Sequence, residues 1–196
     1  MHRPRFSFVY EPANQLQGSF KLLTQIAFSR DQGGFALAGA GRDRAVAYLR
    51  RRDRFIKRLF AAVHTSSGMP ARSEELRMIR WADTAAVPRN VFVYNGWIML
   101  VFSYNKATTK SNNSFYVVRF PCPTIEKVLF MYLAYIRPFS DFLVHQLQIV
   151  RETCSNPHLF TLYKDPNACF SAAACTKSLL QSTPESPTPL TIKRYR

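Results

Sequence analysis

The chain has 196 residues, of which 47% are hydrophobic and 14% aromatic, which is enough for one substantial folded domain and too apolar for an intrinsically disordered protein. Lys and Arg number 27 against 12 Asp and Glu, a formal net charge of +15 at pH 7, and this excess predicts a polyanionic partner. The longest apolar run, 97–102, is far shorter than the roughly 18 residues of a membrane span, so we expect no membrane association.

The first 42 residues show little hydrophobic periodicity, and we expect a partly disordered N-terminal arm with one short amphipathic helix at 20–27. From Asp43 to Val63, apolar residues recur at three- and four-residue steps, which predicts a long helix. Its other face carries six basic residues within nine positions: Arg50, Arg51, Arg52, Arg54, Lys57 and Arg58. This run predicts a face that binds the DNA backbone, with a nuclear-localisation signal or a merely solvated helix surface as alternatives.

A small sheet is expected between helices. A second helix is expected at 71–82, and Pro88 ends that segment. The turn Asn95-Gly96 between two β-rich runs is a strong hairpin signal, and a further run supplies a third antiparallel strand. The three expected strands are 90–94, 97–104 and 115–120.

Two more helices are expected after the sheet, at 125–136, ended by Pro138, and at 140–151. Beyond them the signals weaken. We therefore expect an α+β fold, mostly helical with a small three-stranded antiparallel sheet. The expected organisation is an arm (1–42), a core (43–153) and a poorly ordered C-terminal tail (154–196).

Cysteine usage indicates a reducing compartment. The four cysteines form no Cys-x-x-Cys pair, and the basic N-terminus is not followed by a secretory signal, so we expect reduced thiols and a nuclear location, with the cytoplasm as the alternative. A zinc site is a weaker alternative, because suitable ligand types cluster at Cys154, His158, Cys169 and Cys175. Their spacing matches no common zinc motif, so we expect no metal and no other cofactor.

A spaced set of residues surrounds the second expected helix. It begins Gly68-Met69-Pro70-Ala71-Arg72-Ser73-Glu74-Glu75-Leu76 and continues with Ile79, Trp81 and Asp83. This set resembles the first catalytic box of the tyrosine recombinase (phage integrase) superfamily. The range 67–139 is similar, more closely, to the recombinase-like module that lies upstream of RecQ-type helicase domains in fungal mobile-element proteins. The further shared segments are Arg89-Asn90, Tyr104-x-Lys106, Arg119-Phe120-Pro121, Tyr132-Leu133 and Arg137-Pro138-Phe139.

The resemblance implies roles for particular residues. An arginine at a helix start offers a planar pair of donors to phosphate oxygens, and Arg72 would clamp the scissile phosphate. Glu75 would brace Arg72, and Lys106 would protonate the leaving hydroxyl. Tyrosine recombinases have a second catalytic box that contains a histidine and an arginine. By the resemblance, Lys193 would occupy the position of that histidine and Arg196 the position of that arginine. The plainer alternatives are a helix-surface ion pair between Arg72 and Glu75 and a solvated turn lysine at position 106.

The family nucleophile is a tyrosine well beyond the second box, whereas this sequence ends at Arg196, and Tyr195 is adjacent to that arginine. We therefore expect a truncated, inactive, mobile-element-derived relic of a recombinase-like catalytic domain that binds DNA without cutting it. One alternative is an active DNA strand-transferase that uses a tyrosine supplied by a partner chain. The other is a basic adaptor that binds RNA or an acidic protein.

Overall fold

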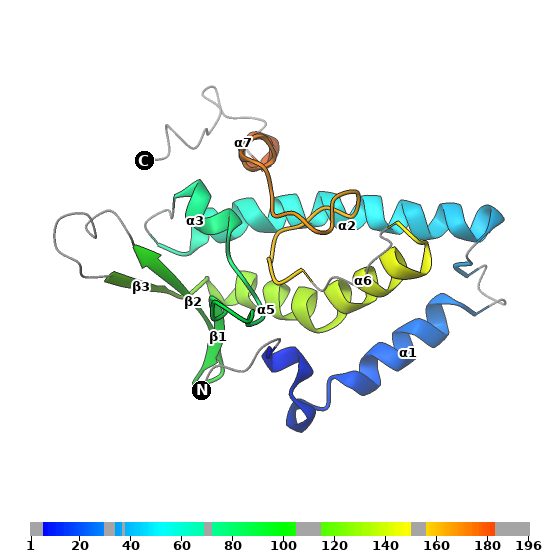
Figure 1. The fold of residues 1–196 in the computed structure, drawn as a ribbon, viewed down its shortest axis with the longest axis horizontal. Helices are drawn as coiled ribbons and strands as arrows, with labels where there is room; N and C mark the ends of the chain where they lie inside the picture. Colours follow the sequence, from blue (N-terminus) through cyan, green and yellow to red (C-terminus); the bar gives the residue numbers. More distant parts are fainter. Residues whose placement is uncertain are drawn as a thin grey trace.

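The computed structural model describes residues 6–29, 34–36, 38–68, 72–104, 115–149 and 156–182. They form layered helices with a three-stranded antiparallel sheet at one end (Figure 1), so the predicted α+β class is confirmed. None of the described helices is both long and apolar enough to cross a lipid bilayer.

The helix α2, Gly39–Ser66, runs along most of the length of the molecule, and the sheet lies near its C-terminal end (Figure 1). The helix starts four residues before the predicted position. Most of its buried apolar residues lie three, four or seven positions from another, which places them along one face; they are Ala45, Leu49, Ile56, Leu59, Phe60, Ala61 and Val63. This face contacts the next helical layer, and α2 therefore forms one wall of the core.

The helix α3, Ser73–Arg77, is much shorter than the predicted 71–82. The residues after it leave the helical path because some of them pair with distant parts of the chain. Arg80 forms an antiparallel bridge with His158, and the Trp81 N–H donates to the Pro157 carbonyl at 2.9 Å. These tertiary contacts outweigh the local helical pattern.

The sheet has the predicted meander order: β1 (Val91–Tyr94), β2 (Trp97–Tyr104) and β3 (Phe115–Arg119). Asn95 and Gly96 have φ values of 49° and 80°, and the positive φ at both central turn positions explains why an Asn-Gly pair connects β1 to β2. The inner side of the sheet contributes buried side chains to the core: Val91, Ile98, Leu100 and Phe102.

The helices α5 (Pro123–Met131) and α6 (Arg137–Gln146) are joined by a π-helical turn, Tyr132–Ile136. The prediction that Pro138 ends the first of these helices is wrong, because Pro138 lies inside α6. Proline has no N–H to donate and clashes with the preceding turn of a regular α-helix. The wider turn just before it lets the helical path continue.

Both ends of the described chain pack more closely than predicted. The helix α1, Gln17–Ala27, confirms the expected N-terminal helix and contacts α6, while Val9 joins the main core. The helix α7, Ala172–Ser182, contacts α2. Leu159 and Phe160 are 0% exposed, so the prediction of a poorly ordered tail from 154 is wrong for 156–182, which belong to the core.

Candidate nucleic-acid interface

The predicted basic run on α2 is divided between solvent and the interior. Arg50, Arg51, Arg54 and Arg58 are exposed and Lys57 is half-buried. Arg52 is only 5% exposed, so its predicted contact with the DNA backbone is wrong. Position 52 is three residues after Leu49 and four before Ile56, both fully buried, and the helical repeat therefore turns it inward.

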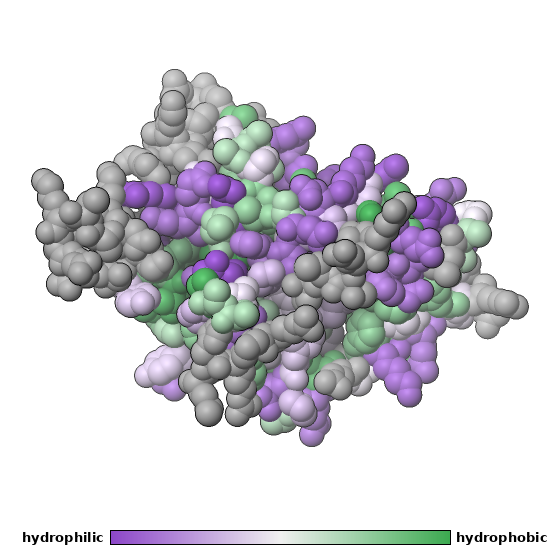
Figure 2. Space-filling view, viewed as in Figure 1, coloured by the Kyte–Doolittle hydropathy of each residue, from purple (hydrophilic) through white to green (hydrophobic). Residues whose placement is uncertain are grey.

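The exposed arginines form a stripe. Arg50, Arg54 and Arg58 are four residues apart, and the rise of an α-helix spaces them by about 6 Å. Within the part of the chain that the structure describes, no carboxylate pairs with them. Hydrophilic residues cover much of the molecular face over α2 (Figure 2). We call these three residues the α2 stripe, and their charges are available to an external anion.

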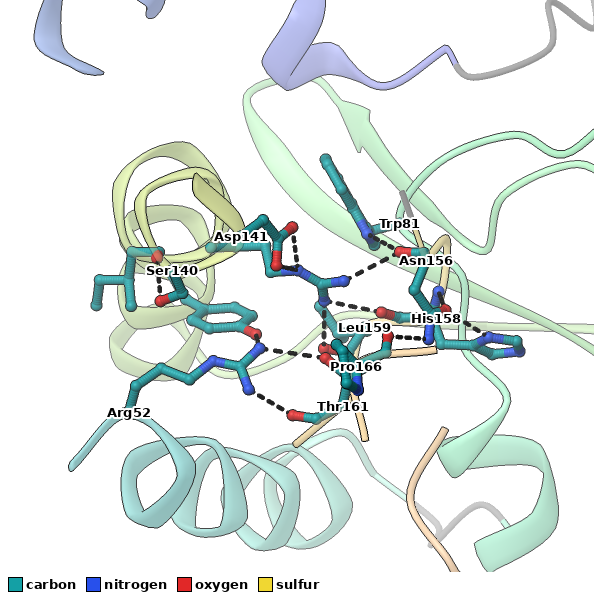
Figure 3. Close-up of polar contacts among 12 residues, drawn as sticks. Arg52, Trp81, Ser140, Asp141, Asn156, His158, Leu159, Thr161 and Pro166 are labelled. Atoms are coloured by element: carbon teal, nitrogen blue, oxygen red, sulfur yellow. Dashed lines mark hydrogen bonds and ion pairs between the residues drawn. The ribbon is translucent and has the colours of Figure 1, made fainter. Parts of the chain in front are cut away.

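Arg52 instead joins three parts of the core. It donates to the Thr161 carbonyl at 2.5 Å, to the Thr161 hydroxyl at 3.2 Å and to the Tyr132 hydroxyl at 2.8 Å (Figure 3). It also pairs with Asp53 at 3.0 Å. Burial raises the pKa of Asp53, more than the adjacent Arg52 lowers it. Arg52 therefore connects α2 to the π turn and to the C-terminal segment.

Arg137 is a second buried arginine, 1% exposed, in the same network. It donates to the two carboxylate oxygens of Asp141 at 3.0 and 2.8 Å, and to the carbonyls of Asn156, His158 and Leu159 at 3.0, 2.9 and 3.3 Å (Figure 3). Burial alone lowers the pKa of Arg137, but the charge of Asp141 raises it overall. This guanidinium holds residues 156–159 against the helices.

Arg72 and Glu75 make the predicted contact. Arg72 precedes α3, with φ −63° and ψ 144°, and its N–H donates to Oε2 of Glu75 at 3.2 Å. The Arg72 Nε lies 3.8 Å from Oε1 of Glu75. The Glu75 carboxylate thus satisfies a backbone donor at the helix start and holds the Arg72 side chain.

A cavity of about 370 Å³ lies beside this pair, and its lining residues come from α3, the segment after it and the sheet. They are Arg72, Glu74, Glu75, Met78, Arg80, Asn90 and Phe102. Asn90 connects two of the contributing segments, because it accepts a hydrogen bond from the Arg80 N–H at 2.9 Å and donates one to the Val101 carbonyl at 2.8 Å.

Two arginines that the sequence analysis did not select also belong to this region. Arg80 lines the cavity, and burial lowers its pKa. The Arg119 guanidinium lies 5.4 Å from the Phe102 ring centre. Phe102 lines the cavity, so Arg119 lies next to it; burial lowers the pKa of Arg119, while the charge of Glu75 raises it. The sequence shows Arg119 only as part of the shared segment Arg119-Phe120-Pro121, since its position beside Phe102 depends on the pairing of β3 with β2.

His158 faces the same basic environment. Its Nδ1 lies 2.9 Å from Oδ1 of Asn156 (Figure 3). Burial lowers the pKa of His158, and the charges of Arg80, Arg137 and Arg77 lower it further. The imidazole is therefore neutral near pH 7, and Nδ1–H donates to Asn156. The sequence analysis had considered His158 only as a zinc ligand.

The cysteines of the zinc alternative have separate surroundings. Cys169 accepts a hydrogen bond from Arg77 at 3.2 Å, and Cys175 lies in the core, where burial raises its pKa to about 12. Among the described residues, no group of three or more His, Cys, Asp or Glu side chains is placed to hold a metal ion. Cys154 lies outside the described ranges.

Three of the predicted site residues also lie outside the described ranges: Lys106, Lys193 and Arg196.

Comparison with protein-family models, curated proteins and solved structures found no match for this chain. The tyrosine recombinase resemblance therefore depends on the sequence motifs.

Proposed function

We propose that this protein binds duplex DNA through the phosphate backbone, with the α2 stripe as its principal contact. The observation that carries the proposal is the row of exposed arginines, Arg50, Arg54 and Arg58, without carboxylate partners in the described residues. The chain as a whole adds a net charge of +15. Such a surface gains affinity by releasing counterions from DNA and does not distinguish sequences.

The cavity beside Arg72 supports the recombinase-like part of the proposal. Arg72, Arg80 and Arg119 bring three guanidinium groups to one region that also holds Glu74 and Glu75. Planar guanidinium groups suit the oxygens of a phosphate. We assign phosphate binding to this cavity, and we propose that the protein is a recombinase-like DNA-binding relic of a mobile element. Its nuclear location stays a prediction.

The test is a fluorescence anisotropy titration of labelled duplexes from about 50 to 200 mM monovalent salt, a range over which phosphate contacts weaken strongly. We expect similar affinity for unrelated sequences and a steep fall with salt. The triple variant R50E/R54E/R58E should bind at least about 100-fold more weakly, with a salt slope reduced by roughly 2.7, about 0.9 for each lost phosphate contact.

The matched control is K21E/K164E/K177E, which changes the net charge equally at exposed lysines on other elements. It should weaken binding much less. Equal losses in both triple variants would mean that overall charge, not the α2 stripe, governs binding. Absence of salt-sensitive binding at about 50 mM, where the Debye length exceeds 10 Å, would overturn the DNA-binding proposal. A covalent protein–DNA adduct on a denaturing gel would instead support the strand-transferase alternative.

A variant of the cavity separates it from the stripe. Arg72→Lys keeps the charge but loses the planar pair of donors, and one phosphate contact contributes little to nonspecific affinity. We expect less than about a threefold change in duplex affinity, a small fraction of the total electrostatic contribution. If this substitution abolished binding, the cavity would be the dominant contact.

A further inference from the structure

The outer side of the three-stranded sheet has an unusual composition. Side chains alternate between the two faces along each strand, and the pairing register shows which residues share the side opposite the core. These outer residues are all apolar or aromatic among the described side chains: Phe92, Tyr94, Trp97, Met99, Val101, Tyr116 and Val118. We call them the outer sheet face.

This face is accessible. Tyr94 is 59% exposed, Trp97 49%, Tyr116 71% and Val118 49%. An antiparallel sheet with one face in the core ordinarily presents polar residues on the other. The inner face already supplies the buried residues that stabilise the fold. Burial in the core therefore does not explain the outer apolar residues, and an exposed group of this kind indicates a binding surface.

The charges beside the face favour an anionic occupant. The Arg89 guanidinium lies between the rings of Phe6 and Phe92, 4.7 and 4.6 Å from their centres. Arg89 forms an ion pair with Asp83, in which a guanidinium nitrogen lies 3.1 Å from Oδ2 of the carboxylate. Arg89 stacked on Phe92 lies at one end of the face with its charge paired to Asp83, so the attraction for an anionic occupant comes from the net charge of the chain, +15.

The Trp97 end has a similar arrangement. Trp97 lies at the edge of the sheet, where it also borders a cavity of about 720 Å³ on the α5 side of the hairpin, together with Phe130 and the exposed Lys127. Glu126 also lines this cavity, but it is 9% exposed and accepts a hydrogen bond from the Ile98 N–H at 2.7 Å. The exposed Trp97 ring therefore has a lysine among the residues of the same sheet edge, and an aromatic ring with a nearby cation suits a flat, apolar group attached to a negatively charged chain.

We propose that the outer sheet face binds single-stranded nucleic acid by stacking unpaired bases on Tyr94, Trp97 and Tyr116. Base–aromatic stacking requires only an accessible ring and tolerates any base, and neighbouring cations hold the backbone. In a duplex the bases are stacked inside the helix, so this activity is separate from backbone binding by the α2 stripe. The chain would thereby bind both duplex and locally opened DNA.

The first test uses the fluorescence of Trp97. The chain has two tryptophans, and Trp81 is 0% exposed, so an added oligonucleotide can stack only on Trp97. The probes are an oligo(dT) of about 12 nucleotides, within the site size of such proteins, and an abasic strand of the same length. At about 0.3 M salt, which weakens phosphate contacts, we expect oligo(dT) to quench the fluorescence and to bind at least about fivefold more tightly than the abasic strand, the effect of one stacked base.

Variants then test the proposed rings. Tyr94→Ser and Tyr116→Ser should each weaken oligo(dT) binding by about 5- to 150-fold. Leu22→Ser, at a position 58% exposed on α1, is the control and should have no effect. R50E/R54E/R58E should keep the quenching by oligo(dT), which distinguishes failure of this inference from failure of the duplex proposal. Circular dichroism confirms that each variant is folded.

Three outcomes would overturn the inference. In the first, oligo(dT) and the abasic strand bind equally. In the second, neither tyrosine substitution weakens oligo(dT) binding. In the third, sedimentation shows a dimer of the chain that Tyr116→Ser dissociates, which would make the outer sheet face a protein interface.

Discussion

Arg52 and Arg54 lie two residues apart on α2, one turned into the interior and the other into solvent. Arg52 uses its donors on a carbonyl, two hydroxyls and the Asp53 carboxylate. Arg54 belongs to the α2 stripe and has no carboxylate partner in the described residues. The basic run is therefore two systems: an inner one that holds the C-terminal segment, and an outer one that an anion can reach.

The two systems differ in what a substitution should change. Removing a buried arginine leaves its carboxylate and carbonyl partners without donors in a medium of low polarity, which lowers the free energy of unfolding. Removing a solvated arginine mainly reduces the attraction for phosphates. Substitution of the buried arginines should therefore change stability, whereas substitution of the exposed arginines of α2 should change DNA affinity.

The largest expected effect is on stability, at Arg137. Arg137→Leu removes a buried cation that donates to Asp141 and to three backbone carbonyls, so the free energy of unfolding should fall by about 3–5 kcal/mol. Urea unfolding measures it. Arg58→Leu, on the exposed side, is the control and should leave the unfolding midpoint nearly unchanged. A loss below about 1 kcal/mol, the contribution of one ordinary hydrogen bond, would show that the Arg137 network does not hold the fold.

The second prediction compares the neighbouring arginines directly. Arg52→Ala should lower the free energy of unfolding by about 2–3 kcal/mol, since it leaves buried acceptors unsatisfied, and should not alter duplex affinity below the unfolding temperature. Arg54→Ala should show the reverse, with unchanged stability and a severalfold weaker duplex affinity at low salt. Urea unfolding and anisotropy on both variants give the answer. If both substitutions changed stability and duplex affinity alike, the distinction between an inner and an outer set of arginines on α2 would be wrong.

The smallest expected effect concerns pH and His158. Burial and the charges of Arg80, Arg137 and Arg77 lower the pKa of His158 below 6.5, so the unfolded chain binds a proton that the folded chain does not. Stability is therefore fully present above about pH 6.5 and falls as the pH drops towards the folded pKa, by at most about 1.4 kcal/mol per pH unit. Unfolding measured from pH 7.5 to 5 should show this decline, and His158→Gln should reduce it. The exposed His145→Gln is the control, and an equal effect there would contradict the assignment.

Local patterns predicted part of this molecule well. The hairpin follows from Asn95-Gly96 between β-rich runs, and the pairing of Arg72 with Glu75 follows from their three-residue separation at a helix start. The burial of Arg52 was also accessible from its spacing to Leu49 and Ile56, but the density of charge around it suggested a uniform basic face. Periodicity is the more reliable guide to which side chain enters the core.

Other features depend on contacts between distant parts of the chain. The helix α3 ends early because Arg80 bridges to His158, and the segment 156–182 is ordered because Leu159 and Phe160 enter a core built by α2, the sheet and α5. Arg80 and Arg119 join the Arg72 region only when these pairings form. Neither composition nor spacing within one segment carries such information.

The π turn at Tyr132–Ile136 determines which faces of α5 and α6 point in the same direction around the helix axis. Such a turn accommodates one extra residue, so the residues after it differ by about 100° from their orientation in a regular α-helix of the same sequence. Leu129 and Tyr132 consequently face the main core, while Phe139 and Leu143 face a separate apolar cluster with Leu49. A regular α-helix through the same residues would swing Arg137 through that angle, away from the carbonyls of 156–159, and would misalign both cores, whereas deleting one residue of the turn should leave Arg137 in place.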